Sequence, residues 1–351
     1  MRLLVTGAAG FIGSDFVRRA LARHGREIAR LVAVDLLTYA GHLGNLGDCL
    51  EDPRVRFERL DVADREAMAG LVAGERIDVL VNFAAESHVD RSIHDHGPFL
   101  RTNVHGVLAL LDAVRGQPGF RRFLQVSTDE VYGSVPEGRT DERAPLRPSS
   151  PYAASKAAAD AFVQAYATTY GVPTTITRCC NNYGPYQFPE KLIPLFVTNA
   201  LDSTPLPLYG DGLQVRDWIH VDDHCDAIWH LLLHDGALGE IFNVSAHAER
   251  NNRQVTEAIL RLTGRPASLV RTVEDRPGHD RRYALDASKL LATGWTPRWR
   301  FEEGLAETIE WYRSQGEWLA SVRSGEYRAY YEQMYGKRLR ESRAAATERE
   351  P

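Results

Sequence analysis

The stretch RLLVTGAAGFIG, residues 2–13, decides the fold class of this chain. Its apolar run at residues 2–6 predicts a buried strand, and the residues after Gly13 repeat apolar side chains at helical spacing. Gly7 would allow the tight turn between them, Gly10 the close approach of backbone to a pyrophosphate, and Gly13 close packing of helix on strand. The free N–H groups at the helix start would face the phosphates. The stretch therefore predicts a dinucleotide-binding turn.

A carboxylate ends the second predicted strand, residues 31–35. Asp35 stands at about the distance from the glycine turn at which dinucleotide-binding units carry an acid. It would accept hydrogen bonds from the adenosine ribose hydroxyls and repel a 2′-phosphate, so NAD is favoured over NADP. The alternative is an ordinary surface carboxylate. Asp61 and Val62 could border the adenine, or they could provide a helix N-cap ahead of residues 64–72.

Apolar strands alternate with helical patterns through the first half of the chain. This alternation predicts an α/β fold, a Rossmann-type doubly wound parallel sheet with helices on both faces. We expect residues 1–180 to form the NAD-binding domain, with some later segments returning to it. Residues 181–335 should form mainly a smaller C-terminal α/β lobe for the substrate, and residues 336–351 a flexible tail. Further strands are predicted at residues 55–60, 79–83, 123–127 and 174–178, and helices at 102–114 and 155–170.

Composition and charge exclude several classes of function. The 351 residues are 44% hydrophobic and 25% charged, as in globular proteins, and the formal net charge of −5 leaves no basic footprint for nucleic acid or an anionic membrane. No apolar run is long enough to span a bilayer, and no cleavable leader precedes the first strand. The four cysteines lack metal-binding spacing, and we interpret them as reduced thiols. We therefore expect a cytoplasmic protein without a metal.

Tyr152 and Lys156 stand four residues apart, on one face at the start of a predicted helix. Tyrosine, with an ordinary pKa of ~10, is a poor base at neutral pH. A neighbouring lysine ammonium, helped by the positive charge of a nicotinamide, would stabilise the phenolate, and the lysine could also hold the nicotinamide ribose. The Y-x-x-x-K pattern alone commonly marks two exposed helix residues. Joined to the glycine turn and to Ser127 and Thr128 at a strand end, it predicts hydride transfer at a carbinol.

The glycine turn together with Tyr152 and Lys156 resembles the extended short-chain dehydrogenase/reductase superfamily. Within it, the chain resembles the dTDP-glucose 4,6-dehydratases from the first strand to about Trp311. Ala8 departs from their pattern, because the family often has a second glycine there. The stretches that carry the closer likeness are AAESHVDRSI at 84–93, TDEVYG at 128–133, NNYGPY at 181–186, EKLIP at 190–194 and DRPGHD at 275–280.

Adjacent Asp129 and Glu130 are the most specific part of this resemblance, since related epimerases and decarboxylases do not usually carry both. A dehydratase needs two carboxyl groups, because after oxidation at C4 of the sugar one removes the C5 proton while the other protonates the departing C6 hydroxyl. The resemblance implies that Glu130 is this base and Asp129 the acid. It also implies that Thr128 hydrogen-bonds the C4 hydroxyl and that Tyr152 takes its proton as hydride passes to NAD. NADH would then return the hydride to C6. The alternative is that both carboxylates are ordinary loop acids.

The resemblance also implies a substrate-binding set for dTDP-glucose. Arg216 and Arg276 would clamp the diphosphate, and Pro207 and Tyr209 would frame the thymine. The asparagine that contacts the nucleotide aligns with Asn252, but its neighbour Asn251 leaves that register open. The full substrate set is Ser87, Thr128, Asn181, Glu190, Lys191, Leu192, Pro207, Tyr209, Arg216, Asn252, Arg276 and His279.

The resemblance implies a cofactor-binding set for NAD that extends beyond the glycine turn. His88 and Asp90 are interpreted as ordering the loop near the nicotinamide, and not as metal ligands. The full cofactor set is Gly7, Gly10, Phe11, Ile12, Gly13, Asp35, Leu36, Leu37, Thr38, Asp61, Val62, Phe83, Ala84, Ala85, Ser87, Thr102, Tyr152, Lys156 and Asn182.

Two other functions fit part of the pattern. A sugar-nucleotide 4-epimerase or decarboxylase would use the same NAD and the same Tyr/Lys pair. A non-catalytic dinucleotide sensor on the same fold is a more remote alternative, because it would not need Tyr152, Lys156 or the two carboxylates. The resemblance further implies a homodimer, in which helices near 103–114 and 155–170 meet a second copy as a four-helix bundle.

Overall fold

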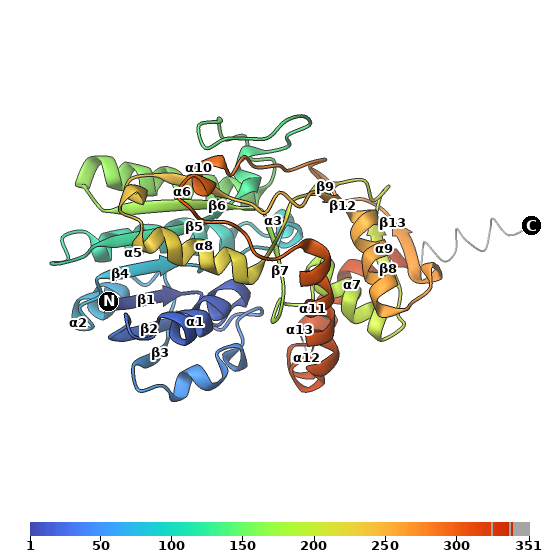
Figure 1. Cartoon of the computed structure of the whole chain (residues 1–351), viewed down its shortest axis with the longest axis horizontal. Coiled ribbons are helices and arrows are strands. Elements are labelled where there is room, and N and C mark those ends of the chain that lie inside the picture. The colour runs from blue at the N-terminus through green and yellow to red at the C-terminus, as the bar shows by residue number, and fades with distance from the viewer. Residues whose placement is uncertain (324–325, 337, 340–351) are drawn as a thin grey trace, which may run out of the picture.

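A seven-stranded parallel sheet lies at the centre of the protein, with strand order β11-β6-β5-β4-β1-β2-β3 (Figure 1). The structure is a computed structural model that describes residues 1–323, 326–336 and 338–339. Every neighbouring pair of strands in this sheet is parallel, which confirms the predicted Rossmann-type α/β fold. The strands are β1 (Arg2–Thr6), β2 (Arg30–Asp35), β3 (Val55–Arg59), β4 (Val79–Asn82), β5 (Arg122–Thr128), β6 (Thr174–Cys179) and β11 (Ile241–Val244).

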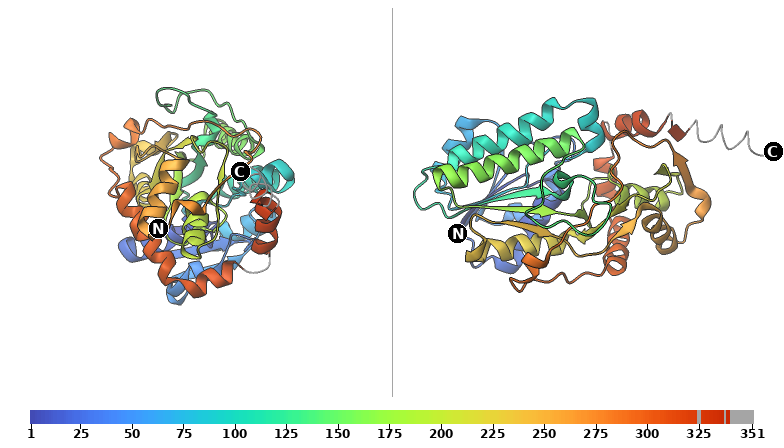
Figure 2. Two further views of the ribbon diagram at one scale, coloured as in Figure 1. Left: turned by 90° about the vertical axis from the view of Figure 1, so that its right-hand side faces the viewer. Right: turned by 90° about the horizontal axis from the view of Figure 1, so that it is seen from above.

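Helices cover both faces of the sheet (Figure 2), which explains why its central strands are apolar on both sides. Successive residues of a strand point to opposite faces. Thus Leu3 and Val5 pack with Phe16 and Ile228 in one core, whereas Leu4 belongs to the core on the other face. The first face carries α1 (Phe11–His24) and α8 (Val221–Leu233), and the second carries α2 (Arg65–Gly74), α5 (Val107–Val114) and α6 (Pro151–Tyr170).

The strand order reverses at β1, which has β2 on one side and β4 on the other. Open α/β sheets bind ligands in the crevice outside the carboxyl ends of the strands at such a switch point. Here β1, β4, β5 and β6 lead directly into Gly7, Phe83, Asp129 and Cys180, and all four residues line one cavity. The topology therefore brings segments distant in sequence to a single site.

A smaller lobe lies beyond the carboxyl edge of the sheet and has its own core, which includes Phe196, Ile259 and Leu305 (Figure 1). Three two-stranded pairs support it: β7 with β10, β8 with β13, and β9 with β12. Its elements are β7 (Asn181–Tyr183), α7 (Leu192–Leu201), β8 (Leu206–Tyr209), β9 (Val215–Arg216), β10 (Trp218–His220), β12 (Arg250–Asn251), α9 (Asn252–Thr263), β13 (Val270–Val273), α11 (Phe301–Ser314), α12 (Gly316–Val322) and α13 (Glu326–Tyr331). Short helices elsewhere are α3 (Val89–His94), α4 (Gly97–Phe99) and α10 (Ser288–Leu291).

Some predicted boundaries differ from those of the structure. The helix expected to begin at residue 155 begins at Pro151, because the Ser150 side chain accepts a hydrogen bond from Ala153 N at 3.1 Å and proline suits the first helical position. The helix expected from residue 102 is preceded without a break by a π-helical segment, Leu100–Gly106. Of the predicted tail, residues 337 and 340–351 lie outside the described residues. Within the described part of the chain, no helix combines the length and apolarity needed to cross a bilayer.

Candidate active site

The glycine turn is shaped by two close approaches of backbone to backbone. Gly7 has φ +64°, and a Cβ there would lie 2.6 Å from Ala84 N. A Cβ on Gly13 would collide with the carbonyl oxygen of Gly7. Both positions therefore require glycine for the turn to sit against β4 and α1, with the start of α1 left open toward the cavity.

Asp35 holds the loop that follows β2 against the glycine turn. Its carboxylate accepts hydrogen bonds from Ala9 N at 2.9 Å and from Leu37 N at 2.8 Å. Burial raises the pKa of Asp35, and these backbone hydrogen bonds partly oppose that rise. The carboxylate is thus 9% exposed and structurally engaged, unlike the surface carboxylate considered as the alternative.

A cavity of about 310 Å³ runs from the glycine turn to the carboxyl ends of β5 and β6. It brings together Tyr152, Lys156, the Thr128–Glu130 triplet and the predicted cofactor residues Gly7, Gly10, Phe11, Ile12, Gly13, Phe83, Ala85, Ser87 and Asn182. The wall also contains Ser127, noted from the sequence at the strand end. Residues of its wall that the sequence did not indicate are Ala40, Val126, Cys179, Cys180, Gln187, Phe188, Ile193, Trp218 and His224.

Several predicted cofactor residues lie outside this cavity wall. Asp61 forms an ion pair with Arg101 at 2.7 Å, and Val62 is buried in the core between the sheet and α2 and α5. The helix N-cap is Asp64, whose side chain accepts from Ala67 N, so the alternative role of Asp61 as a helix N-cap is wrong. The other predicted cofactor residues outside the cavity wall are Asp35, Leu36, Leu37, Thr38, Ala84 and Thr102.

Tyr152 and Lys156 both face the cavity from the first turns of α6. Lys156 Nζ donates to the carbonyl oxygen of Val126 at 2.7 Å, and burial lowers the pKa of Lys156 to about 8 against the attraction of Asp160. The pKa of Tyr152 is raised, first by burial and then by the charge of Glu130, while a hydrogen bond with Thr128 opposes the rise. The expectation that Lys156 lowers the pKa of Tyr152 stays a prediction, because it also depends on the positive charge of the nicotinamide.

A buried ion pair fixes the helix that carries these two residues. Arg178 Nε of β6 lies 2.9 Å from Asp160 Oδ2 of α6, and both side chains are almost fully buried. Since Asp160 is one turn beyond Lys156, the pair anchors α6 to the sheet beside the site.

Asp129 and Glu130 follow β5 in a single helical turn, Asp129–Tyr132, capped by the Thr128 hydroxyl, which accepts from Glu130 N at 3.3 Å. Burial and the adjacent Glu130 raise the pKa of Asp129 well above its usual range, and Asp129 Oδ2 is buried with no hydrogen-bond partner among the described residues. Burial also raises the pKa of Glu130, but the cations Arg276, Arg216 and Lys191 oppose that rise. The two carboxyl groups therefore sit in different electrostatic environments.

A second cavity of about 150 Å³ lies between the sheet edge and the smaller lobe. It shares Glu130, Asn181 and Lys191 with the first cavity, so the two are contiguous. Every predicted substrate residue lines one or both of them: Ser87 and Thr128 the first, Asn181, Glu190, Lys191 and Leu192 both, and Pro207, Tyr209, Arg216, Asn252, Arg276 and His279 the second.

Three cations, Lys191, Arg216 and Arg276, line the second cavity where a diphosphate was expected, together with the carboxylates Asp90, Glu130 and Glu190. Arg276 Nη1 is 3.0 Å from Asp90 Oδ1, and Lys191 Nζ donates to the carbonyl oxygen of Ser87 at 2.8 Å. Arg216 is held by the carbonyl of Asp280 at 3.1 Å. These contacts orient the cations without neutralising all three, since among the described residues only Arg276 of the three has an ion-pair partner.

The structure separates the two asparagines whose register was open. Asn251 caps α9, where it forms a capping box with Gln254, whereas Asn252 lines the second cavity and is 5% exposed. His88 and Val89 also line this cavity, together with Tyr283 and Tyr335. The part of the chain that the structure describes contains no cluster of three or more His, Cys, Asp or Glu side chains that could hold a metal ion.

Known proteins resemble this chain along almost its whole length. The family described as GDP-mannose 4,6 dehydratase matches residues 4–308. The dTDP-glucose 4,6-dehydratase of Xanthomonas campestris pv. campestris is 49% identical over 344 residues, covering 93% of this chain and 97% of that protein.

Solved structures give the same grouping. DesIV of Streptomyces venezuelae, a dTDP-glucose 4,6-dehydratase whose double mutant was solved with NAD and DAU bound, superposes with a TM-score of 0.89 at 49% identity, covering 92% of this chain and all of that one. The UDP-glucose 4-epimerase of Thermus thermophilus, solved with NAD, superposes with a TM-score of 0.82 at 34% identity over 90% of this chain. The fold is thus shared with epimerases, but the greater identity is to dehydratases. The chain belongs to the dTDP-glucose 4,6-dehydratases, within the family described by GDP-mannose 4,6 dehydratase.

Proposed function

We propose that this protein is an NAD-dependent hydro-lyase that converts dTDP-glucose to dTDP-4-keto-6-deoxyglucose for deoxysugar biosynthesis. One observation carries the proposal: Glu130, beside Asp129, lies where the cavity of the glycine turn meets the second cavity, which Arg216 and Arg276 line. A sugar whose nucleotide lies in the second cavity would reach Tyr152 and both carboxyl groups at this junction.

The residues of the first cavity fit NAD. The backbone-only surface at Gly7 and Gly10 and the open start of α1 suit a pyrophosphate, and Asp35 beside the turn suits ribose hydroxyls. Lys156 faces the cavity next to Tyr152, where it would hold the nicotinamide ribose. When bound, NAD would accept a hydride from C4 of the sugar and later return it to C6.

Tyr152 would take the proton of the C4 hydroxyl during the oxidation. Because burial and Glu130 raise the pKa of Tyr152, its phenolate requires nearby positive charge. Lys156, one helical turn away, is the nearest cation on α6 that can supply it. Thr128, bonded to the Tyr152 side chain, would orient the C4 hydroxyl toward it.

Asp129 and Glu130 would divide the elimination of water. Oxidation at C4 makes the C5 proton acidic, and Glu130, whose ionised form is favoured by three cations, would remove it. Asp129, whose raised pKa favours its protonated form, would donate its proton to the departing C6 hydroxyl. The C5–H and C6–O bonds break, a C5–C6 double bond forms, and water leaves. Hydride at C6 and a proton at C5 then complete the product, with NAD regenerated.

Arg216, Arg276 and Lys191 would bind the diphosphate, and Tyr209 with Pro207 would frame the thymine. Burial lowers the pKa of Arg216 and of Lys191, which disfavours their charged forms. An anionic ligand would stabilise those charged forms. We also propose a cytoplasmic location and a homodimer. The π-helical segment and α6 expose Leu100, Phe162 and Tyr170, which could meet a second copy.

The decisive experiment is incubation with dTDP-glucose, followed by the ultraviolet absorbance that a 4-keto sugar develops in alkali. We expect this absorbance to appear with far less NAD than sugar, since the cofactor is regenerated in each turnover. Galactose or pentose products without the absorbance would instead indicate an epimerase or a decarboxylase. A Tyr152→Phe variant should lose at least ~100-fold in turnover; full turnover in that variant would remove Tyr152 from the role of base. Binding of NAD by the unaltered protein without turnover of a sugar nucleotide would favour the dinucleotide sensor.

A further inference from the structure

Three side chains from distant segments meet beside the junction of the two cavities. Tyr39 lies in the loop at residues 36–42 that follows β2, Arg91 lies on α3, and Glu190 precedes α7. The guanidinium carbon of Arg91 is 3.7 Å from the centroid of the Tyr39 ring, a cation–π contact. Arg91 Nε and Nη2 each donate to Glu190 Oε2 at 3.3 Å. Arg91 therefore joins an aromatic ring of one segment to a buried carboxylate of another.

The loop that carries Tyr39 is fixed to the glycine turn at both ends. At its start, the Asp35 carboxylate accepts from Leu37 N at 2.8 Å and from Ala9 N at 2.9 Å. At its end, His42 N donates to the carbonyl oxygen of Ala9 at 3.0 Å. The place of the Tyr39 ring, on which Arg91 lies, is therefore set by the backbone of the glycine turn.

Glu190 lines both cavities together with Glu130 and Lys191, where the reacting sugar would lie. An ionised carboxylate has only acceptor oxygens, so Glu190 can bind hydroxyl groups of that sugar. Its side chain is 2% exposed, and a charge buried to that degree requires a cationic partner. Burial raises the pKa of Glu190, whereas the charges of Lys191 and Arg91 oppose the rise. Among the described residues, Arg91 forms the ion pair with Glu190.

We propose that Arg91, held on the ring of Tyr39, is a positioning residue that keeps Glu190 ionised in the cavity wall, where its carboxylate accepts hydrogen bonds from hydroxyl groups of the sugar. The inference rests on the proposed function, because it takes the ligand to be a nucleotide-linked sugar. Neither Arg91 nor Tyr39 belongs to the wall of either cavity, so both act through Glu190 and not by touching the substrate.

This role predicts a selective loss of affinity when the contacts of Arg91 are removed. The thymine and the diphosphate are assigned to other residues of the second cavity, and Glu190 is assigned to the sugar. Loss of the Arg91 ion pair should therefore weaken the binding of dTDP-glucose and leave the binding of dTDP unchanged. A merely structural role of Arg91 would weaken both ligands alike.

The test measures the KM for dTDP-glucose and the inhibition constant of dTDP, with NAD in excess. Arg91→Met should raise the KM at least ~10-fold, because hydrogen bonds between charged groups are lost. The inhibition constant of dTDP should change less than ~2-fold, because the nucleotide binds at a separate set of residues. Arg91→Lys restores a cation without the planar fork and should bring the KM to within ~3-fold of the parent value. Tyr39→Leu removes the aromatic face alone and should raise the KM ~3-fold.

The matched control is Arg115→Met. Arg115 also lies over a tyrosine ring, that of Tyr170 at 4.5 Å, but it lines neither cavity, so both constants should stay at the parent values. An unchanged KM in Arg91→Met, or an equal loss of affinity for dTDP-glucose and dTDP, would overturn the inference.

Calorimetric titration makes the test independent of turnover. With NADH present, which cannot accept a hydride, dTDP-glucose and dTDP can each be titrated into the parent and into Arg91→Met. The ratio of the Kd for dTDP-glucose to that for dTDP should rise at least ~10-fold in the variant; the same ratio in both proteins would refute the role of Arg91. A parent that shows this difference but makes no 4-keto sugar would overturn the proposed reaction and leave the positioning of Glu190 standing.

Discussion

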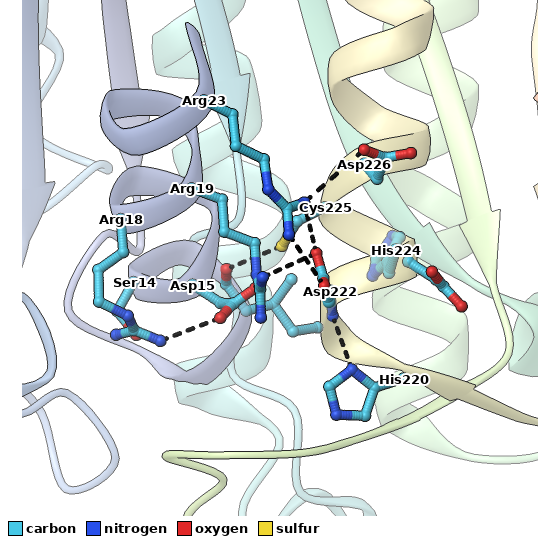
Figure 3. Close-up of polar contacts among 12 residues, drawn as sticks. Ser14, Asp15, Arg18, Arg19, Arg23, His220, Asp222, His224, Cys225 and Asp226 are labelled. Carbon is cyan, nitrogen blue, oxygen red and sulfur yellow. Dashed lines mark hydrogen bonds and ion pairs between the residues drawn. The ribbon is translucent and has the colours of Figure 1, made fainter. Parts of the chain in front are cut away.

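Two carboxylates in this protein are similarly buried but have opposite surroundings. Asp222 of α8 lies between cations of α1: Arg23 Nη1 is 2.7 Å and Arg19 Nη1 2.9 Å from its Oδ1 (Figure 3). Arg298 adds a third contact at 3.1 Å. Asp129, at the end of β5, has Glu130 as its neighbour and one oxygen without a hydrogen-bond partner among the described residues.

The pKa values of the two groups move in opposite directions as a result. Burial raises both, but at Asp222 the hydrogen bond and charge of Arg23, with Arg19, reverse the effect, so the pKa of Asp222 is lowered. At Asp129 the neighbouring carboxylate adds to burial, and the pKa rises well above its usual range. Burial alone therefore does not determine the state of a carboxyl group; its partners do.

Because their surroundings differ, Asp222 and Asp129 suit different tasks. Asp222 joins α8 to α1 through Arg23, and it joins α8 to the segment before α11 through Arg298. The charge of Asp222 therefore holds these elements together. Asp129 lacks such partners among the described residues, and its raised pKa favours the protonated form that the proposed acid would need. Changing each carboxylate to an amide should therefore have contrasting consequences.

The largest effect is expected at Glu130, the neighbour of Asp129. Glu130→Gln should lower dehydration of dTDP-glucose by at least ~100-fold, since an amide cannot remove the C5 proton, and should leave NAD binding intact. Solvent deuterium incorporation at C5 and titration with NAD measure the two properties. Glu137→Gln, an exposed glutamate in the same loop region, is the control and should be fully active. Unimpaired exchange at C5 in Glu130→Gln would remove Glu130 from the role of base.

At Asp222, the carboxylate with arginine partners, the expected effect is on stability. Asp222→Asn should lower the free energy of unfolding by about 2 kcal/mol at pH 7, because it leaves several partly buried arginines without their counter-charge. The lowered pKa means that this stabilisation is present above the ordinary carboxyl pKa and is lost as the pH falls through the folded value. Denaturant melts at pH 7 and pH 3 test this.

The neighbouring Asp226→Asn is the control for that change. Asp226 is more exposed, and its contacts to Arg23 and Arg298 are 3.8 and 3.5 Å. It should lower the free energy of unfolding by less than about 0.5 kcal/mol. Equal losses at the two positions would show that the buried contacts of Asp222 add nothing to its stabilising effect.

The sequence predicted those parts of the site that follow single strands. The glycine turn after β1 and the Thr128–Glu130 triplet after β5 could be found because each is a contiguous motif, and a parallel sheet brings strand ends to one edge. The extended substrate set was found through family resemblance, and all of it lines the two cavities.

Groups assembled by pairing across the lobes could not be predicted in the same way. His224 reaches Asn182 because β10, which precedes α8, pairs with β7 in the register Ile219 to Asn182. No local pattern in the sequence specifies that register. The ion pair of Asp61 with Arg101 could not be predicted for a related reason, because Arg101 comes from a distant segment.

The smallest predicted effect sharpens the comparison most, because its sign is opposite to that at Asp222. Asp129→Asn should raise the free energy of unfolding by about 1 kcal/mol at pH 8 while abolishing dehydration, since a neutral amide avoids the cost of a buried charge without partners. The raised pKa gives the pH dependence: Asp129 costs nothing below the ordinary carboxyl pKa, where it is protonated in both states, and its cost grows as the pH rises toward the folded value. The gain in Asp129→Asn should therefore vanish near pH 4, whereas the loss in Asp222→Asn should be largest at neutral pH. A destabilised Asp129→Asn at pH 8 would mean that Arg216 holds Asp129 as a charged partner, and that the acid of the elimination lies elsewhere.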